Sequence, residues 1–264
     1  MSFTASDVRE GDILLLMYND WSAQLIALLD NGIYSHSAYF NGQYVVGCIR
    51  EGLVHNDMAT TLADKETTYI DVYRFYGNAG DPACVMGSPG WPAAPVTRIC
   101  NDYMQKGVSY AFDDLYFYWV LIILHNLPKT AADRKKMWFL INALVFLADK
   151  AAPSLHKGMI CSEFVTRVFL ENPEYERYAL RFSDAYQIPG PPDQEFEPVY
   201  KAALEALKAI DPTLEQKIAS AQSGSLSALA PELVTPNNLR LSPSLKFMGR
   251  ILGTGAPPDG SVGH

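Results

Sequence analysis

A hairpin signal early in the chain constrains its fold more than any other sequence feature. The segments SHSAYF, residues 35–40, and QYVVGCI, residues 43–49, both have strand composition, and only an Asn-Gly dipeptide separates them. Asn-Gly favours the positive φ angles of a two-residue hairpin turn. Apolar or alternating runs predict further strands at residues 11–18 and 68–75. The chain therefore favours an antiparallel sheet.

Other segments have the spacing of helices. Residues 20–32 end at a glycine, and residues 95–107 have a proline near their start and a glycine at their end. Residues 161–170, with the sequence CSEFVTRVFL, place apolar side chains on one helical face. Strands and helices together predict an α+β fold in which an antiparallel sheet packs against helices.

Two apolar blocks, residues 115–124 and 137–150, flank a polar bridge in the middle of the chain. Each block is too short to cross a bilayer alone, which takes about 20 residues. We therefore expect an apolar helical hairpin. The pattern leaves open whether this hairpin is buried in the core, forms an apolar wall beside a site, or contacts a membrane surface.

The order of these segments predicts the domain organisation. One domain covers residues 1–187 and includes a helical insert at about 111–152. A linker-like stretch then leads into a helical extension, residues 188–252, which packs on the body of the protein. Residues 253–264 are rich in Gly and Pro and predict a disordered tail.

Composition excludes several classes of function. The formal net charge of −8 argues against binding to nucleic acid, whose phosphates select basic surfaces. The four cysteines form no CxxC pair, and none has a histidine at metal-ligand spacing, so we expect reduced thiols, no metal and no cofactor. The chain begins without the basic and apolar pattern of a signal peptide, which predicts synthesis in the cytoplasm. Delivery by a dedicated secretion system stays open.

Cys161 is the first candidate for chemistry because it opens a predicted helix. A helix N-terminus favours the thiolate, and the backbone N–H groups of the first turn can stabilise an oxyanion. The alternative is that Cys161 is a small buried hydrophobic residue, which is the usual role of a free cysteine.

His36 is the candidate base for such a nucleophile. On the predicted strand it shares a face with Ala38 and Phe40, which fits the wall of an enclosed site. The alternative is a hydrogen-bonded core histidine. The other histidines lie in predicted loops, in the tail or at the end of an apolar block.

These segments, in this order, resemble a known family. GDILLLMY, then SHSAYFNGQYVV, then a helix beginning CSEFV is similar to the circularly permuted branch of the NlpC/P60 papain-like superfamily, which includes YiiX-like and lecithin:retinol acyltransferase-like proteins. GVSYAFDD at 107–114 and VTPNNLRLSPSL at 234–245 resemble two further segments of that branch. The resemblance covers roughly residues 8–182 and the second of these segments. It implies a permuted papain-like fold, with the histidine strand before the cysteine helix.

The resemblance also implies roles for individual residues. Cys161 matches the nucleophile and His36 the general base. Many relatives carry a glutamate on the next strand to orient the imidazole, but Gly47 stands at that position here. Glu51 is then the candidate third member, with Gln43 and Asn41 as other groups that could reach the ring. The candidates for contact with substrate are Tyr110, which matches a tyrosine of the family, and Tyr34, Trp119 and Trp138.

Relatives of this kind act on peptide-like amides or on acyl lipids, through an acyl-thioester. The apolar blocks favour an acyl lipid, most concretely a phospholipid, because each buried methylene contributes about 0.8 kcal/mol. We therefore expect a cysteine hydrolase or acyltransferase of phospholipase type. A peptidoglycan or other peptide-amide hydrolase and a non-catalytic lipid-binding module are the alternatives. A lipid hydrolase without a signal peptide also suggests a secreted effector toxin, which would have an immunity protein as partner.

Overall fold

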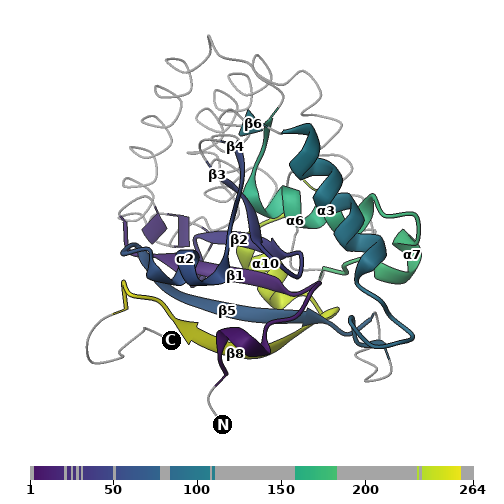
Figure 1. The fold of residues 1–264 in the computed structure, drawn as a ribbon, viewed down its shortest axis with the longest axis horizontal. Coiled ribbons are helices and arrows are strands. Elements are labelled where there is room, and N and C mark those ends of the chain that lie inside the picture. Colours follow the sequence, from purple (N-terminus) through teal and green to yellow (C-terminus); the bar gives the residue numbers. More distant parts are fainter. Residues whose placement is uncertain are drawn as a thin grey trace, which may run out of the picture.

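The computed structural model of the chain describes residues 3–20, 23–24, 26–27, 30, 32–49, 52–77, 84–107, 109–110, 158–182, 231 and 234–256. Within these ranges the centre of the fold is a six-stranded antiparallel sheet in the order β4-β3-β2-β1-β5-β8 (Figure 1). Its strands are β1 Ile13–Tyr18, β2 His36–Phe40, β3 Val45–Ile49, β4 Gly52–Asn56, β5 Thr67–Phe75 and β8 Leu245–Leu252. The predicted antiparallel sheet, packed against helices, is confirmed.

Helices and one small sheet complete the described part of the chain. Strands β6 and β7 form a two-stranded parallel sheet. These further elements are η1 Ala5–Asp7, α2 Met58–Ala63, α3 Ala94–Lys106, β6 Ser109–Tyr110, β7 Gly158–Met159, α6 Cys161–Leu170, α7 Tyr175–Tyr178 and α10 Pro236–Leu241. Helices α3 and α6 match the two segments that helical spacing and end signals predict there.

The predicted hairpin joins β2 to β3. Gly42 has a φ of 94°, a conformation that glycine adopts without strain, and Ala38 pairs with Gly47 beyond the turn. Strand β1 lies on the other side of β2, with Leu16 opposite His36. Strand β1 also pairs with β5 on its other side. The histidine strand β2 therefore lies near the middle of the sheet.

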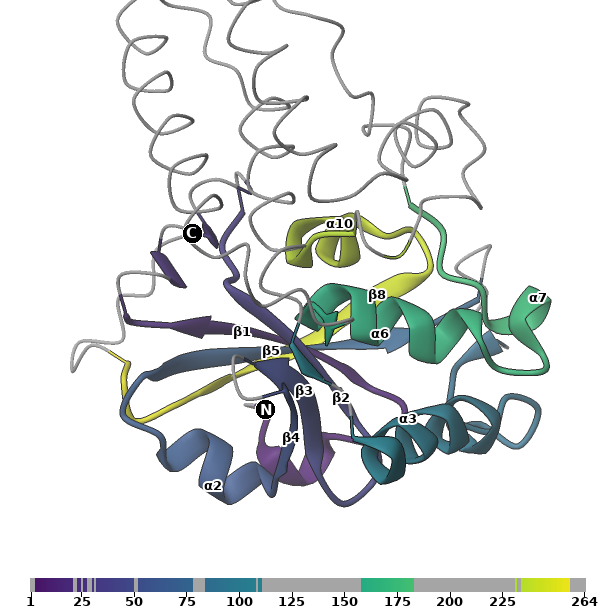
Figure 2. The same cartoon turned by 90° about the horizontal axis from the view of Figure 1, so that it is seen from above.

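The two faces of the sheet carry separate core clusters. Alternate residues of a strand point to opposite faces, and directly paired residues share a face. One cluster joins Leu15, Tyr39 and Val46 to α6 and α3, through Phe164, Val165, Val168, Val96 and Cys100. The other joins Leu14, Leu16, Ala38, Ile70 and Val72 to Val8 and to α2, through Met58 and Leu62. Figure 2 shows α6 and α10 along the first face.

The C-terminal strand β8 is part of this central sheet. It pairs with β5, which places Arg250 opposite Asp71. The Arg250 guanidinium holds the Asp71 carboxylate through two bonds, from Nε at 2.6 Å and from Nη2 at 2.8 Å. The Asp71 carboxylate is almost fully buried and also accepts the Tyr34 hydroxyl at 2.6 Å. A segment expected within a helical extension thus contributes a strand and a buried ion pair.

Several predictions fall on residues that are not described. The helical insert, most of the C-terminal extension and residues 257–264 lie outside the described residues, so the domain boundaries stay predictions. Residues 253–255, which the sequence places in a disordered tail, are instead held by backbone bonds to residues 62–68. The papain-like detail of the fold stays a prediction as well. In the described ranges, no helix has the length and apolar character needed to cross a bilayer.

Candidate active site

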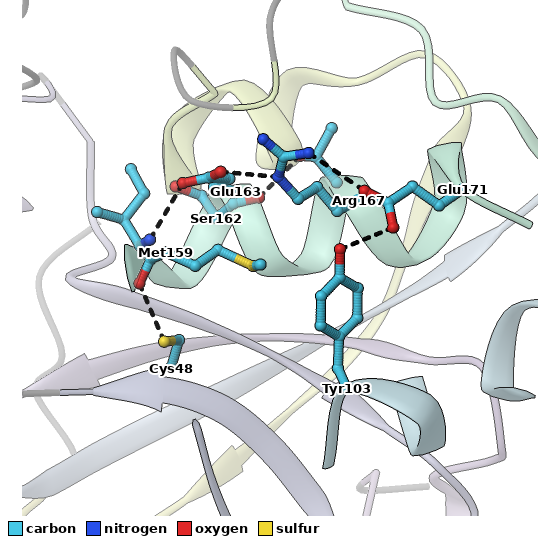
Figure 3. A network of polar contacts seen from close by, with 9 residues as sticks. Cys48, Tyr103, Met159, Ser162, Glu163, Arg167 and Glu171 are labelled. Atoms are coloured by element: carbon cyan, nitrogen blue, oxygen red, sulfur yellow. Dashed lines mark hydrogen bonds and ion pairs between the residues drawn. The ribbon is translucent and has the colours of Figure 1, made fainter. Parts of the chain in front are cut away.

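Cys161 is the first residue of α6, and the start of this helix is tightly held. The backbone of Ile160 is extended before it, and the Ile160 N–H donates to the Glu163 carboxylate at 3.3 Å. Figure 3 shows the contacts that continue along the helix: Arg167 Nε donates to Glu163 at 2.7 Å, and Arg167 Nη1 donates to Glu171 at 3.1 Å. Tyr103 of α3 donates its hydroxyl to Glu171 at 2.7 Å. These bonds close the first turn of α6 and join the other end of the helix to α3.

The sulfur of Cys161 lies in a largely dry environment, with 9% of the residue exposed. Burial raises the pKa of the thiol. The nearby backbone N–H and hydroxyl of Ser37, and the backbone N–H groups of Ser162 and Cys161, favour the charged form of the thiol and so oppose that rise in pKa. Helix-start geometry alone predicts a readily ionised thiol. The structure differs because burial outweighs the hydrogen bonds, so the resting sulfur keeps its proton.

Strand β2 presents Ser37 and His36 to opposite faces of the sheet. Ser37 pairs with Leu15, on the face covered by α6, whereas His36 pairs with Leu16, on the other face. The sulfur therefore meets β2 at the residue next to His36. Although both residues are described, the structure records no hydrogen bond between the thiol and the imidazole. Because the two side chains belong to opposite faces of β2, the pairing of Cys161 with His36 requires a turn of the imidazole and stays a prediction.

The His36 ring is buried, and burial lowers its pKa to about 4, which keeps the imidazole neutral at physiological pH. The ring lies over Gly47, where a Cβ atom would stand 2.7 Å from Nε2. The His36 ring also packs near the Tyr18 ring, and the two ring centroids are 5.8 Å apart. Burial raises the pKa of Tyr18, and the charge of Cys161 adds to that rise, so Tyr18 lies near both candidate residues.

A buried carboxyl, Asp30, also belongs to this neighbourhood. Its Oδ2 accepts the Asn237 backbone N–H at 2.8 Å. Burial raises the pKa of Asp30 to about 7; a hydrogen bond from Thr235 opposes the rise and the charge of Cys161 adds to it. The Ser162 hydroxyl donates to the Val234 carbonyl at 2.5 Å. The segment 234–237 thus contacts both Asp30 and the residue next to Cys161.

Sequence reasoning missed Asp30, Ser37 and Tyr18. Asp30 stands at the end of a predicted helix, where a polar residue needs no further explanation. Ser37 and Tyr18 read as ordinary strand residues. The nearness of Asp30 to the thiol depends on a segment about two hundred residues away in the sequence, and no local pattern reports such a contact.

The remaining predicted site residues are less closely connected to the thiol. The Tyr34 hydroxyl donates to Asp71 and lies 3.0 Å from the Tyr73 hydroxyl. These contacts hold the Tyr34 side chain against β5. Gln43 and Asn41 bond to Tyr44 in the hairpin turn, and neither has a recorded bond to His36. The predicted contact of Tyr34 with substrate, and the predicted contacts of Gln43 and Asn41 with the imidazole, stay predictions.

Other candidates cannot be placed at the level of side chains. Tyr110 belongs to β6, and its backbone pairs with Met159 of β7, two residues before Cys161. Its side chain, and all of Glu51, Trp119 and Trp138, lie outside what the structure describes. Their roles stay predictions. Among the described residues, no group of three or more His, Cys, Asp or Glu side chains is arranged to hold a metal ion.

Comparison with known proteins finds distant similarity among solved structures. No family model matches the sequence, and no curated protein is similar to it. Among solved structures, the crystal structure of the metalloprotein YiiX from Escherichia coli is similar over 92% of this chain and 98% of its own, with 13% identity and a TM-score of 0.43. At this TM-score the similarity carries no conclusion about family, metal content or activity.

Proposed function

We propose that this protein is a cysteine hydrolase or acyltransferase that attacks an acyl ester or amide, with Cys161 as nucleophile and His36 as base. One observation carries the proposal: the Cys161 thiol is buried at the first position of α6, which covers the face of the sheet to which Ser37 points, one residue from His36 on β2. A thiol, nearby backbone N–H donors and an imidazole are the groups that acyl transfer requires. His36 directly precedes Ser37 on β2, and in this proposal its ring turns from the other face of the sheet to reach the sulfur.

The chemistry follows from these groups. The thiol proton passes to a nitrogen of the neutral His36 imidazole while the sulfur forms a bond to the acyl carbonyl carbon. The backbone N–H groups of Cys161, Ser162 and Ser37, which act on the thiol, are the proposed donors to the resulting oxyanion. The C–O or C–N bond then breaks, the leaving group takes the proton from the imidazolium, and an acyl-thioester remains. Water or another acceptor attacks the thioester and restores the thiol.

The protonation states of the unliganded site agree with this order of events. Burial keeps both the thiol and the imidazole uncharged at rest. The thiolate and imidazolium charges then develop only as the reaction proceeds. Donors around the sulfur and the polar groups of the substrate stabilise these charges in place of bulk water. The neutral imidazole has a free lone pair for the proton, as a general base must have.

The substrate class is a separate part of the proposal. An acyl lipid, most concretely a phospholipid, is supported by the apolar blocks at 115–124 and 137–150, which lie outside the described residues. The argument is therefore compositional: an acyl chain gains about 0.8 kcal/mol for each methylene that leaves water.

Release of labelled fatty acid from phospholipid vesicles tests the proposal. We expect release by the wild type and none by Cys161→Ala, while Cys84→Ala, which removes a half-buried thiol outside this site, remains active. Equal release by wild type and Cys161→Ala would contradict the proposed nucleophile. Vesicle binding without release would favour a lipid-binding module. Products from purified peptidoglycan in place of lipid, read by mass spectrometry, would redirect the substrate to a peptide amide.

A further inference from the structure

The Ser37 hydroxyl is buried without a full hydrogen bond. Ser37 has no exposed surface, and its Oγ finds no partner with ordinary hydrogen-bond geometry in the part of the chain that the structure describes. Buried polar groups are nearly always paired, so an unpaired hydroxyl in the middle of a sheet needs an explanation.

The group that Ser37 approaches is the Cys161 sulfur. Ser37 lies on the face of β2 that α6 covers, and its hydroxyl and backbone N–H both favour the charged form of the thiol. A neutral thiol is a weak acceptor, whereas a thiolate is a strong one. One explanation therefore accounts for the unpaired hydroxyl and for its place beside the thiol: the sulfur becomes a strong acceptor for this hydroxyl only when the thiol is ionised.

Other titratable groups near the sulfur make such a donor necessary. Asp30 on the segment before β2, Tyr18 on β1 and Cys48 on β3 all become negative when they ionise, and the charge of Cys161 raises the pKa of each in addition to burial. His36 is neutral at physiological pH. Arg240 on α10 acts on Asp30. The sulfur thus acquires its charge among neutral and acidic groups, where hydrogen-bond donors have the largest effect.

We propose that Ser37 is a catalytic residue of the thiol site, whose hydroxyl donates a hydrogen bond to the Cys161 sulfur as the thiol loses its proton. The inference rests on the proposed function and names a further residue for it. The hydroxyl and the backbone N–H of the same residue then act on one atom from one position of β2. When the sulfur attacks the acyl carbonyl carbon, the sulfur loses its negative charge. The Ser37 hydroxyl can then donate its hydrogen bond to the neighbouring oxyanion instead.

Alkylation of Cys161 by iodoacetamide as a function of pH tests the proposal in the full chain. Peptide mass spectrometry separates Cys161 from the other three cysteines. Removing one donor raises the pKa of a thiolate by about one unit, so Ser37→Ala shifts the alkylation midpoint upward by about that amount and slows alkylation about tenfold at a fixed pH below it. In the vesicle assay, we expect kcat to fall about tenfold with little change in KM, because the bond forms after substrate has bound.

Two variants serve as controls. Ser88→Ala also removes a buried hydroxyl without a partner in the described residues, but far from the thiol in sequence and in a loop; it leaves the alkylation profile unchanged. Ser37→Thr keeps the hydroxyl and restores the wild-type midpoint. Thermal melting establishes that each variant is folded, and Ser37→Gly repeats the measurement if the alanine variant does not fold.

The outcomes separate this inference from the proposed function. A shifted midpoint for Ser37→Ala, with an unshifted one for Ser88→Ala, supports the role of Ser37. A reactive Cys161 whose profile is identical in wild type and Ser37→Ala contradicts that role alone. A wild-type Cys161 that resists alkylation up to about pH 10, well above the usual thiol pKa, contradicts the proposed nucleophile and the inference together.

Discussion

The His36 imidazole lies over Gly47, and it uses the space that a side chain on Gly47 would need. A Cβ atom at position 47 would stand 2.7 Å from His36 Nε2 and 3.4 Å from the Ala38 Cβ. The contact follows from the sheet, because Ala38 and Gly47 are paired across β2 and β3 and share a face with His36. Position 47 is also where the sequence departs from the glutamate of the family it resembles. Here the ring is positioned by close packing on a glycine.

Gly47→Ala tests the importance of this packing. The added methyl group pushes the imidazole out of its place, and overpacking of this kind costs about 1–3 kcal/mol of unfolding free energy. We expect that loss in urea denaturation, together with at least a tenfold lower rate of acyl release. Gly90→Ala is the matched control, since a Cβ at Gly90 has nothing within 4 Å. Wild-type activity in Gly47→Ala would show that the ring does not need its observed position.

Opposing titrations predict how stability depends on pH. Burial lowers the pKa of His36 to about 4, so between pH 4 and the ordinary value of 6.5 unfolding takes up a proton and stability rises with pH. Burial raises the pKa of Asp30 from 3.8 to about 7, so across that range unfolding releases a proton and stability falls with pH. The two effects oppose each other over most of the same window.

Asp30→Asn exposes the histidine effect. Relative to wild type, its unfolding free energy rises between pH 4 and 6.5 by up to about 1.4 kcal/mol per unit, or about 3 kcal/mol in total. His36→Gln behaves in the opposite way, and its stability relative to wild type falls as pH increases over that range. Denaturant titrations at several pH values measure both. Parallel curves for all three proteins would contradict the assigned pKa directions.

The ion pair between Arg250 and Asp71 predicts a large effect at the C-terminal strand. Arg250→Met leaves the Asp71 carboxylate buried without its cation, and breaking a buried pair in this way costs about 3–5 kcal/mol. The exposed pair of Arg177 and Glu174 is the control, and Glu174→Gln costs at most about 1 kcal/mol. Equal, small losses in urea denaturation would indicate that β8 does not depend on this ion pair.

Local sequence signals predicted the hairpin and the cysteine helix well. The Asn-Gly turn is specific, and the apolar face of residues 161–170 has an unambiguous helical period. His36 was also assigned correctly to the face of Ala38 and Phe40, because alternation along a strand decides this directly. These features depend on neighbours within a few residues in the sequence.

Features that depend on distant segments were not predictable in this way. Strand β8 contains Lys246, Gly249 and Arg250, and most of its residues are half-buried or exposed, so its sequence pattern is weak. Its pairing with β5 defines it. The ionisation of Cys161 depends on how deeply β2 and α6 bury the sulfur. The closeness of Asp30 to the thiol depends on the segment 234–237.

The central claim is that the Cys161 sulfur carries the acyl group during turnover. The most direct measurement is mass spectrometry of the protein after acid quenching of a reaction with vesicles of a defined phospholipid. We predict an adduct of one fatty-acyl group in thioester linkage on the peptide that contains Cys161, sensitive to hydroxylamine and absent from Cys161→Ser. Fatty acid released at the wild-type rate by Cys161→Ser, or an acyl adduct on a different residue, would contradict the account.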